Sequence, residues 1–226
     1  MADLFREVDE VMRQERIEKF WSENKAYIIG VILGTILLTG LISGYRSWNS
    51  SVKEKQTAAL IAMQESPEYP GNILNAEELP MRAGLRGIAL LQAAGTFLDQ
   101  DKTEDALTLY QRVSQDKELP GELQDLGTLM SVRLQIDRGD QDGQSLLDQL
   151  IPLVSNLQSP WVHHARIEAA LITADKLGDY STALTHLNAV LDTPDLPQSL
   201  TDRARALAHL YGMKNKSISE KQDETG

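Results

Sequence analysis

The sequence predicts an all-α protein in which a single N-terminal transmembrane helix precedes an α-solenoid, a stack of helix pairs. Three observations support this fold class. Residues 26–45 contain no side chain that is charged at neutral pH, and prolines recur at Pro80, Pro120, Pro160 and Pro197. Each of these prolines is followed by apolar residues at helical spacing. Intervals of this length are typical of helix-pair repeats, so we expect about three helix pairs and a C-terminal capping helix.

Residues 1–25 form a predicted cytoplasmic stub that is partly an amphipathic helix. The sequence is compatible with two locations for the apolar stripe of this helix: on the lipid surface, or against a partner protein. The stub carries five Lys and Arg residues, whereas the first sixteen residues after residue 45 carry three. Because Lys and Arg are enriched on the cytoplasmic side of a membrane, the N-terminus is predicted to be cytoplasmic. The stripe consists of Leu4, Phe5, Val8, Val11, Met12, Ile17, Phe20 and Trp21.

Residues 26–45 are the predicted transmembrane helix. Twenty residues at about 1.5 Å each give roughly 30 Å, the thickness of the hydrocarbon layer. Only Thr35, Thr39 and Ser43 interrupt the apolar run, and at a spacing of four they lie on one face, where their hydroxyls can bond to their own helix. The run is longer than the apolar region of a signal peptide, about 7–15 residues, and no small-residue cleavage site follows it. An uncleaved anchor is therefore favoured.

Glycines and aromatic residues mark two kinds of membrane site in this helix. Gly30 and Gly34 form one GxxxG pair, and Gly40 and Gly44 form a second. Such pairs allow two membrane helices to approach closely, so we expect one of them to pack on a partner helix. Aromatic residues near the ends favour the headgroup zone, and the predicted interface residues are Trp21, Tyr45 and Trp48.

A connector, residues 46–79, follows the predicted span. Apolar residues at helical spacing continue to residue 64, and the segment SPEYPGN, with two prolines and a glycine, then ends the helix.

Residues 80–212 are the predicted repeat domain. In its first and third pairs a small residue near the start of the second helix, Ala106 or Ala183, is followed four positions later by Tyr110 or Leu187. The small residue lets two helices cross closely and the large one lies on the same face. This arrangement fits the tetratricopeptide scheme. The predicted signature residues are Ala94, Ala106, Tyr110, Ala170, Ala183 and Leu187.

The middle pair departs from this scheme. Ser145 is predicted to occupy the alanine position, because positions 106, 145 and 183 are 39 and 38 residues apart. In addition, Pro152 lies inside the second helix of this pair. An irregular helical bundle is therefore the alternative fold. Residues 199–211 form the predicted capping helix, and residues 213–226 are polar and expected to be a loose tail.

The composition argues against nucleic acid as a partner and against catalysis. Beyond residue 25 the chain has 26 acidic and 17 basic residues, with no basic cluster. There is no cysteine, phosphate-binding glycine loop or hydrolase motif. His163 and His164 are adjacent, so on a helix they point about 100° apart. The segment RGDQDGQSLLDQ resembles a calcium loop, but Arg138 and Gln149 replace its two strongest carboxylate ligands. We therefore predict a non-enzymatic protein without a cofactor or metal.

The sequence resembles the YfgM-like family, ancillary subunits of the bacterial Sec translocon. The segments ENKAYIIGVILG and YRSWNS support the resemblance, which is clearest over residues 20–60 and weaker to about residue 191. The longer acidic stub, the degenerate middle repeat and the polar tail depart from the family pattern. The most specific matches are Glu23, Asn24, Gly30, Gly34, Trp48 and Asn49.

The resemblance implies a single-pass protein of the bacterial inner membrane with its repeat domain in the periplasm. It implies association with SecYEG and with a membrane-anchored chaperone of the prolyl-isomerase type, to assist newly exported client chains. The residues alone leave two alternatives: an anchored adaptor for a different envelope complex, such as a division or secretion machine, and an enzyme whose site is not evident from the sequence.

Overall fold

A computed structural model of the chain describes the backbone of residues 2–139 and 141–225. Side chains are described for residues 21, 24, 25, 27, 30, 31, 33–139 and 141–218. Within these residues the chain is helical and contains no strand, which confirms the all-α class. Contacts divide the chain into two compact units, Met1–Lys55 and Gln56–Gly226.

The first unit consists of most of α1, a helix over Ala2–Gln64 whose last residues belong to the second unit. This helix ends at Gln64, before the segment SPEYPGN. Side chains of residues 2–20 lie outside the described residues, so the amphipathic stripe of the stub stays a prediction.

Within the part of the chain that the structure describes, none of the helices combines the length and the apolar character that a membrane crossing requires. The predicted span, residues 26–45, includes residues 26, 28, 29 and 32, whose side chains lie outside the described residues. The membrane anchor therefore also stays a prediction.

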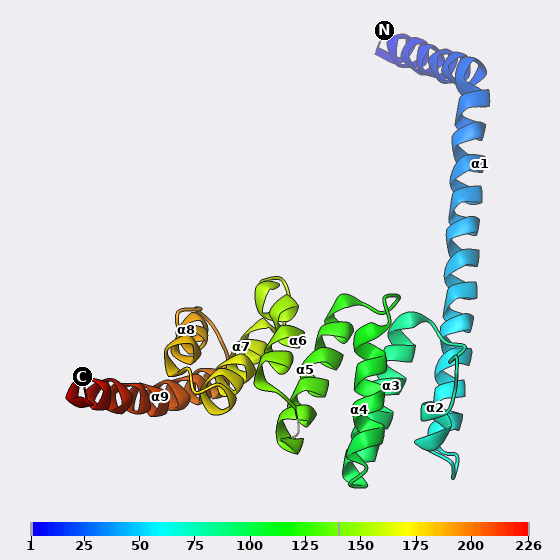
Figure 1. Ribbon diagram of the computed structural model, residues 1–226. Helices are drawn as coiled ribbons and strands as arrows, with labels where there is room; N and C mark the ends of the chain where they lie inside the picture. Colours follow the sequence, from blue (N-terminus) through cyan, green and yellow to red (C-terminus); the bar gives the residue numbers. More distant parts are fainter. Residues whose placement is uncertain (1, 140, 226) are drawn as a thin grey trace. The chain divides into compact units, whose positions relative to one another are not determined.

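The second unit is a row of helices in which each element packs on the next, from α3 to α9 (Figure 1). The predicted pairs are α3 with α4, α5 with α6, and α7 with α8. Such nearest-neighbour packing is consistent with an α-solenoid. The bounds are α2 Gly71–Leu74, α3 Ala83–Asp99, α4 Thr103–Gln115, α5 Gly121–Arg138, α6 Gly143–Ser155, α7 Val162–Leu171, α8 Tyr180–Leu191 and α9 Gln198–Thr225, with a π-helical turn η1 Ile172–Lys176 after α7.

The core runs through the whole row as three successive apolar clusters. The first lies around α3 and α4 and includes Leu60 from the end of α1. The second lies between α5, α6 and α7, and the third joins α7, α8 and α9. All six predicted signature residues are at most 5% exposed: Ala94, Ala106, Tyr110, Ala170, Ala183 and Leu187.

The predicted register of the middle pair is wrong by one residue. Ser145 is exposed, whereas Leu146 is fully buried. Leu146 is the fourth residue of α6, as Ala106 is of α4 and Ala183 is of α8. Counting from Leu146, the intervals are 40 and 37, equal to the last two proline intervals. The position at the helix crossing therefore holds a large residue in this pair.

The helix caps explain this register. Asp142 precedes α6 and its carboxylate accepts a hydrogen bond from the backbone N–H of Ser145. Asp179 precedes α8 and accepts in the same way from Thr182. An aspartate at this position satisfies an N–H group that has no partner within the helix. Ser145 is thus equivalent to the capped Thr182, and RGDQDGQSLLDQ contains an inter-helix turn.

The expected loose tail is also wrong, because α9 continues as a helix to Thr225. Residues 213–225 contain neither proline nor glycine and are rich in Lys, Glu and Gln, which favour helices. The ammonium group of Lys214 lies 5.5 Å from the ring centre of Tyr180 and 5.9 Å from that of Tyr211, which holds the start of this extension against the stack.

Candidate functional site

The predicted membrane-helix sites lie open on α1. A Cβ atom added at Gly30, Gly34, Gly40 or Gly44 would meet nothing within 4 Å. Between these pairs, the hydroxyls of Thr35 and Thr39 each donate to the carbonyl four residues earlier at 2.8 Å, as the spacing predicted. The predicted interface aromatics are also exposed: Trp21 by 53%, Tyr45 by 65% and Trp48 by 63%.

In the second unit, the first helices of successive pairs form a common surface, here called the first-helix face: α3, α5, α7 and the capping helix α9. Direct contacts join α3 to α5 and α5 to α7. Between η1 and α9, the hydroxyl of Tyr211 donates to the carboxylate of Asp175 at 3.1 Å. Stacks of this kind present an extended surface on which partner segments bind.

Two glycines that the sequence did not predict as signature residues lie where neighbouring elements approach closely. Gly87 and Gly127 are both buried and lie seven residues after Pro80 and Pro120. The equivalent positions in the next helices are occupied by Ile167 and Ala204, which are fully buried. The repeated spacing from proline was the signal that could have identified them.

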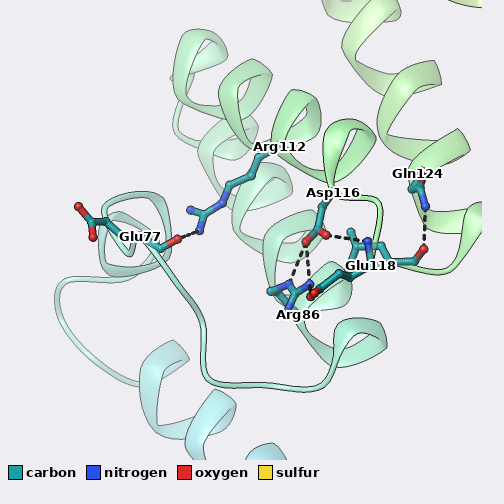
Figure 2. A network of polar contacts seen from close by, with 7 residues as sticks. Glu77, Arg86, Arg112, Asp116, Glu118 and Gln124 are labelled. Carbon is teal, nitrogen blue, oxygen red and sulfur yellow. Dashed lines mark hydrogen bonds and ion pairs between the residues drawn. The ribbon is translucent and has the colours of Figure 1, made fainter.

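The first hollow lies where the connector meets the first pair and has a volume of about 550 Å³. Figure 2 shows the polar network around it. The guanidinium of Arg86 pairs with Asp116 at 2.9 Å and with Glu118 at 2.8 Å. Arg112 donates to the backbone carbonyl of Glu77 at 2.7 Å. The lining residues are Glu77, Glu78, Leu79, Arg86, Arg112, Gln115, Asp116 and Glu118.

This network joins the connector to α4 and the α4–α5 loop to α3. The Arg86 side chain is only 17% exposed, and its hydrogen bond to Glu118 is the main cause that raises its pKa, against the opposing effect of burial. Gln124 on α5 donates to the carbonyl of Leu119 in the same loop at 2.7 Å. Arg86 is thus paired with two carboxylates, and Arg112 donates to a backbone carbonyl.

A second hollow, of about 340 Å³, lies between α5, α7 and α9. Beneath it Glu168 is 3% exposed. The Nε and Nη2 atoms of Arg133 lie 2.8 and 2.7 Å from Glu168 Oε1. Nη2 of Arg203 lies 3.3 Å from the same oxygen. Sequence reasoning missed this cluster, although the three residues are spaced 35 apart, close to the repeat period.

His164 lines the same hollow. Burial is the main cause that lowers its pKa, and the positive charges of Arg133 and Arg203 lower it further. Burial, followed by the charge of Arg166, likewise lowers the pKa of His163 and His186. All three pKa shifts favour the neutral imidazole over the charged one.

Stability is expected to fall as the solution becomes acidic. The unfolded histidines titrate near their ordinary pKa of about 6.5, and the folded ones titrate lower. Protons therefore bind the unfolded chain first, so the histidine contribution is complete above pH of about 6.5 and is lost below it. Thermal unfolding of wild type and His164→Gln across this range measures the effect.

The matched control for that experiment is His209→Gln, because His209 is exposed on α9. The His164→Gln variant should lose less stability on acidification than the control. Equal losses in the two variants would contradict the prediction.

Among the described residues, no group of three or more His, Asp or Glu side chains is arranged to hold a metal ion. Comparisons of the chain with protein-family models, with curated proteins and with solved structures gave no match.

Proposed function

We propose that the protein is a non-enzymatic, membrane-anchored scaffold whose helix pairs bind other proteins. The observation that carries this proposal is the stack itself. Three helix pairs and α9 share successive apolar clusters. One polar hollow opens between the first helices α5 and α7 and the capping helix α9, and another lies beside the connector and the first pair. A surface of this length suits extended segments or helices of partner proteins.

The proposal includes tetratricopeptide-like repeats. Glycines seven residues after proline in the first two pairs, and the buried small residues Ala106 and Ala183 in the second helices, support this assignment. They place small residues where neighbouring helices cross. Leu146 and Pro152 make the middle pair atypical.

The proposed partners follow from the resemblance to the YfgM-like family. They are the SecYEG translocon, a membrane-anchored prolyl-isomerase-type chaperone and newly exported client chains. The proposed location is the bacterial inner membrane, with the N-terminus in the cytoplasm and the repeats in the periplasm. The uncharged run 26–45 and the exposed aromatics Tyr45 and Trp48 support an anchor at this position.

Purification of the full chain in mild detergent, with identification of the proteins that remain bound, tests this function. A photo-crosslinking residue at Trp48 adds a position-specific measurement at the proposed membrane border. Adducts with a Sec subunit are the expected result. Adducts only with proteins of a different envelope complex would replace the Sec proposal with the adaptor alternative.

The double variant Gly30→Leu with Gly34→Leu is expected to weaken partner recovery while membrane insertion stays normal. Leucine side chains would fill the flat surface on which another helix could pack. The matched control is Thr35→Leu with Thr39→Leu, which has the same spacing and whose native hydroxyls already bond within the helix. If both double variants recover partners equally well, the glycines have no packing role.

A further inference from the structure

The hollow between α5, α7 and α9 differs from the first hollow in its charge. Its charged lining residues are Arg133 and Arg203, and both pair with the single buried carboxylate of Glu168. With His164 neutral, two guanidiniums and one carboxylate leave one positive charge in excess. In the first hollow the two arginines face four acidic side chains.

The two arginines remain accessible for a ligand although they are paired. Their side chains are 33% and 42% exposed, whereas that of Glu168 is 4% exposed. Their contacts to one carboxylate oxygen use only part of the N–H groups that a guanidinium carries. Glu168 therefore orients the two side chains, and both of them line the hollow.

The other lining residues fit one carboxylate and its apolar neighbour. Ser199 lies in the first turn of α9, where helix N–H groups lack partners within the helix and favour an anion. Pro197 and Leu200 provide an apolar wall beside the arginines. One excess positive charge matches a singly charged carboxylate better than a doubly charged phosphate.

We propose that this hollow binds the side-chain carboxylate of an acidic residue in an extended segment of a partner protein. The inference rests on the proposed function and names the chemistry that the stack recognises. Beyond residue 25 the chain carries 26 acidic against 17 basic residues, so acidic segments are repelled over most of the surface. A local basic site on the first-helix face would therefore fix both the position and the register of such a segment.

The experiment is a fluorescence-anisotropy titration of purified full-length protein in mild detergent. The probe is a labelled hexapeptide that contains leucines and two glutamates and has an amidated C-terminus. The comparison peptide has glutamines and an amidated C-terminus. The acidic probe is expected to bind, and the neutral one is not.

Three variants make the titration specific. Arg203→Gln is expected to weaken binding of the acidic probe by about tenfold or more, because a charge-assisted hydrogen bond is lost. Arg205→Gln is the matched control, since Arg205 lies two residues away, is 66% exposed and pairs with Asp202. Glu168→Gln keeps an acceptor for both arginines but adds one unit of positive charge, so it should tighten binding by about threefold or more.

The opposite signs expected for Arg203→Gln and Glu168→Gln separate a binding site from a structural ion pair. Thermal unfolding of each variant verifies that the stack is folded. Equal binding of the two peptides, or equal weakening by Arg203→Gln and Arg205→Gln, would overturn the proposal. The hollow would instead be a phosphate site if inorganic phosphate displaced the probe at lower concentrations than the unlabelled acidic peptide does.

Failure of the carboxylate site is distinguishable from failure of the proposed function. Recovery of partners by the full chain together with no binding of the acidic probe removes this site and leaves the scaffold in place. Binding of the probe without recovery of Sec subunits keeps the carboxylate site and removes the proposed partners.

Discussion

Replacing Leu146 with alanine is expected to lower the free energy of unfolding by about 2–5 kcal/mol. Ser145→Ala, one residue earlier, is expected to change it by less than about 0.5 kcal/mol. Leu146 is 0% exposed and packs in the cluster between α5, α6 and α7, together with Leu150 and Val132. Removing its side chain leaves a cavity, because the helices on both sides are fixed by their own neighbours.

Urea unfolding followed by far-UV circular dichroism measures both variants. The comparison tests the register of the middle pair, because a repeat aligned on Ser145 would place that residue at the helix crossing. A larger loss of unfolding free energy for Ser145→Ala than for Leu146→Ala would support a register with intervals of 39 and 38 residues. That result would contradict the structure. The side chain of Ser145 is exposed, and only its backbone N–H takes part in the cap.

The prolines and apolar spacing were sufficient to predict the order of the helices after residue 80. Pro80, Pro120, Pro160 and Pro197 precede α3, α5, α7 and α9, as expected for a residue that cannot continue a helix. The alignment within the middle pair was wrong by one residue because intervals of 39 and 38 residues fit a helix-pair repeat nearly as well as the proline intervals of 40 and 37. Counted from Ala106, the proline intervals reach Leu146, a large residue at a position where the tetratricopeptide scheme predicts a small one.

The sequence did not predict which side chains pair between helices that are far apart along the chain. Arg133, Glu168 and Arg203 meet only because α5, α7 and α9 pack at particular angles and the long arginine side chains reach one oxygen. A 35-residue spacing alone does not distinguish this pairing from three solvated charges. The π-helical turn after α7 was equally inaccessible, since Ile172 and Ala174 also fit ordinary helical spacing.

Gly127→Ala is expected to destabilise the stack by about 1–3 kcal/mol, although alanine favours a helix over glycine by about 1 kcal/mol. A Cβ atom at Gly127 would lie 2.8 Å from the backbone nitrogen of Ser114 and 2.9 Å from the carbonyl oxygen of Tyr110. These are backbone atoms of α4, so relief requires the two helices to move apart. Such a shift would disturb the buried contacts of Val113 and Tyr110.

Gly95→Ala on α3 is the matched control, because a Cβ atom there meets nothing within 4 Å. This variant should gain up to about 1 kcal/mol from helix propensity alone. Chemical unfolding of the two variants therefore gives changes of opposite sign. A gain for both would mean that α4 and α5 do not cross closely at Gly127. Opposite signs would show that the glycine seven residues after Pro120 is required by the helix crossing and that the loss is not a general effect of replacing glycine.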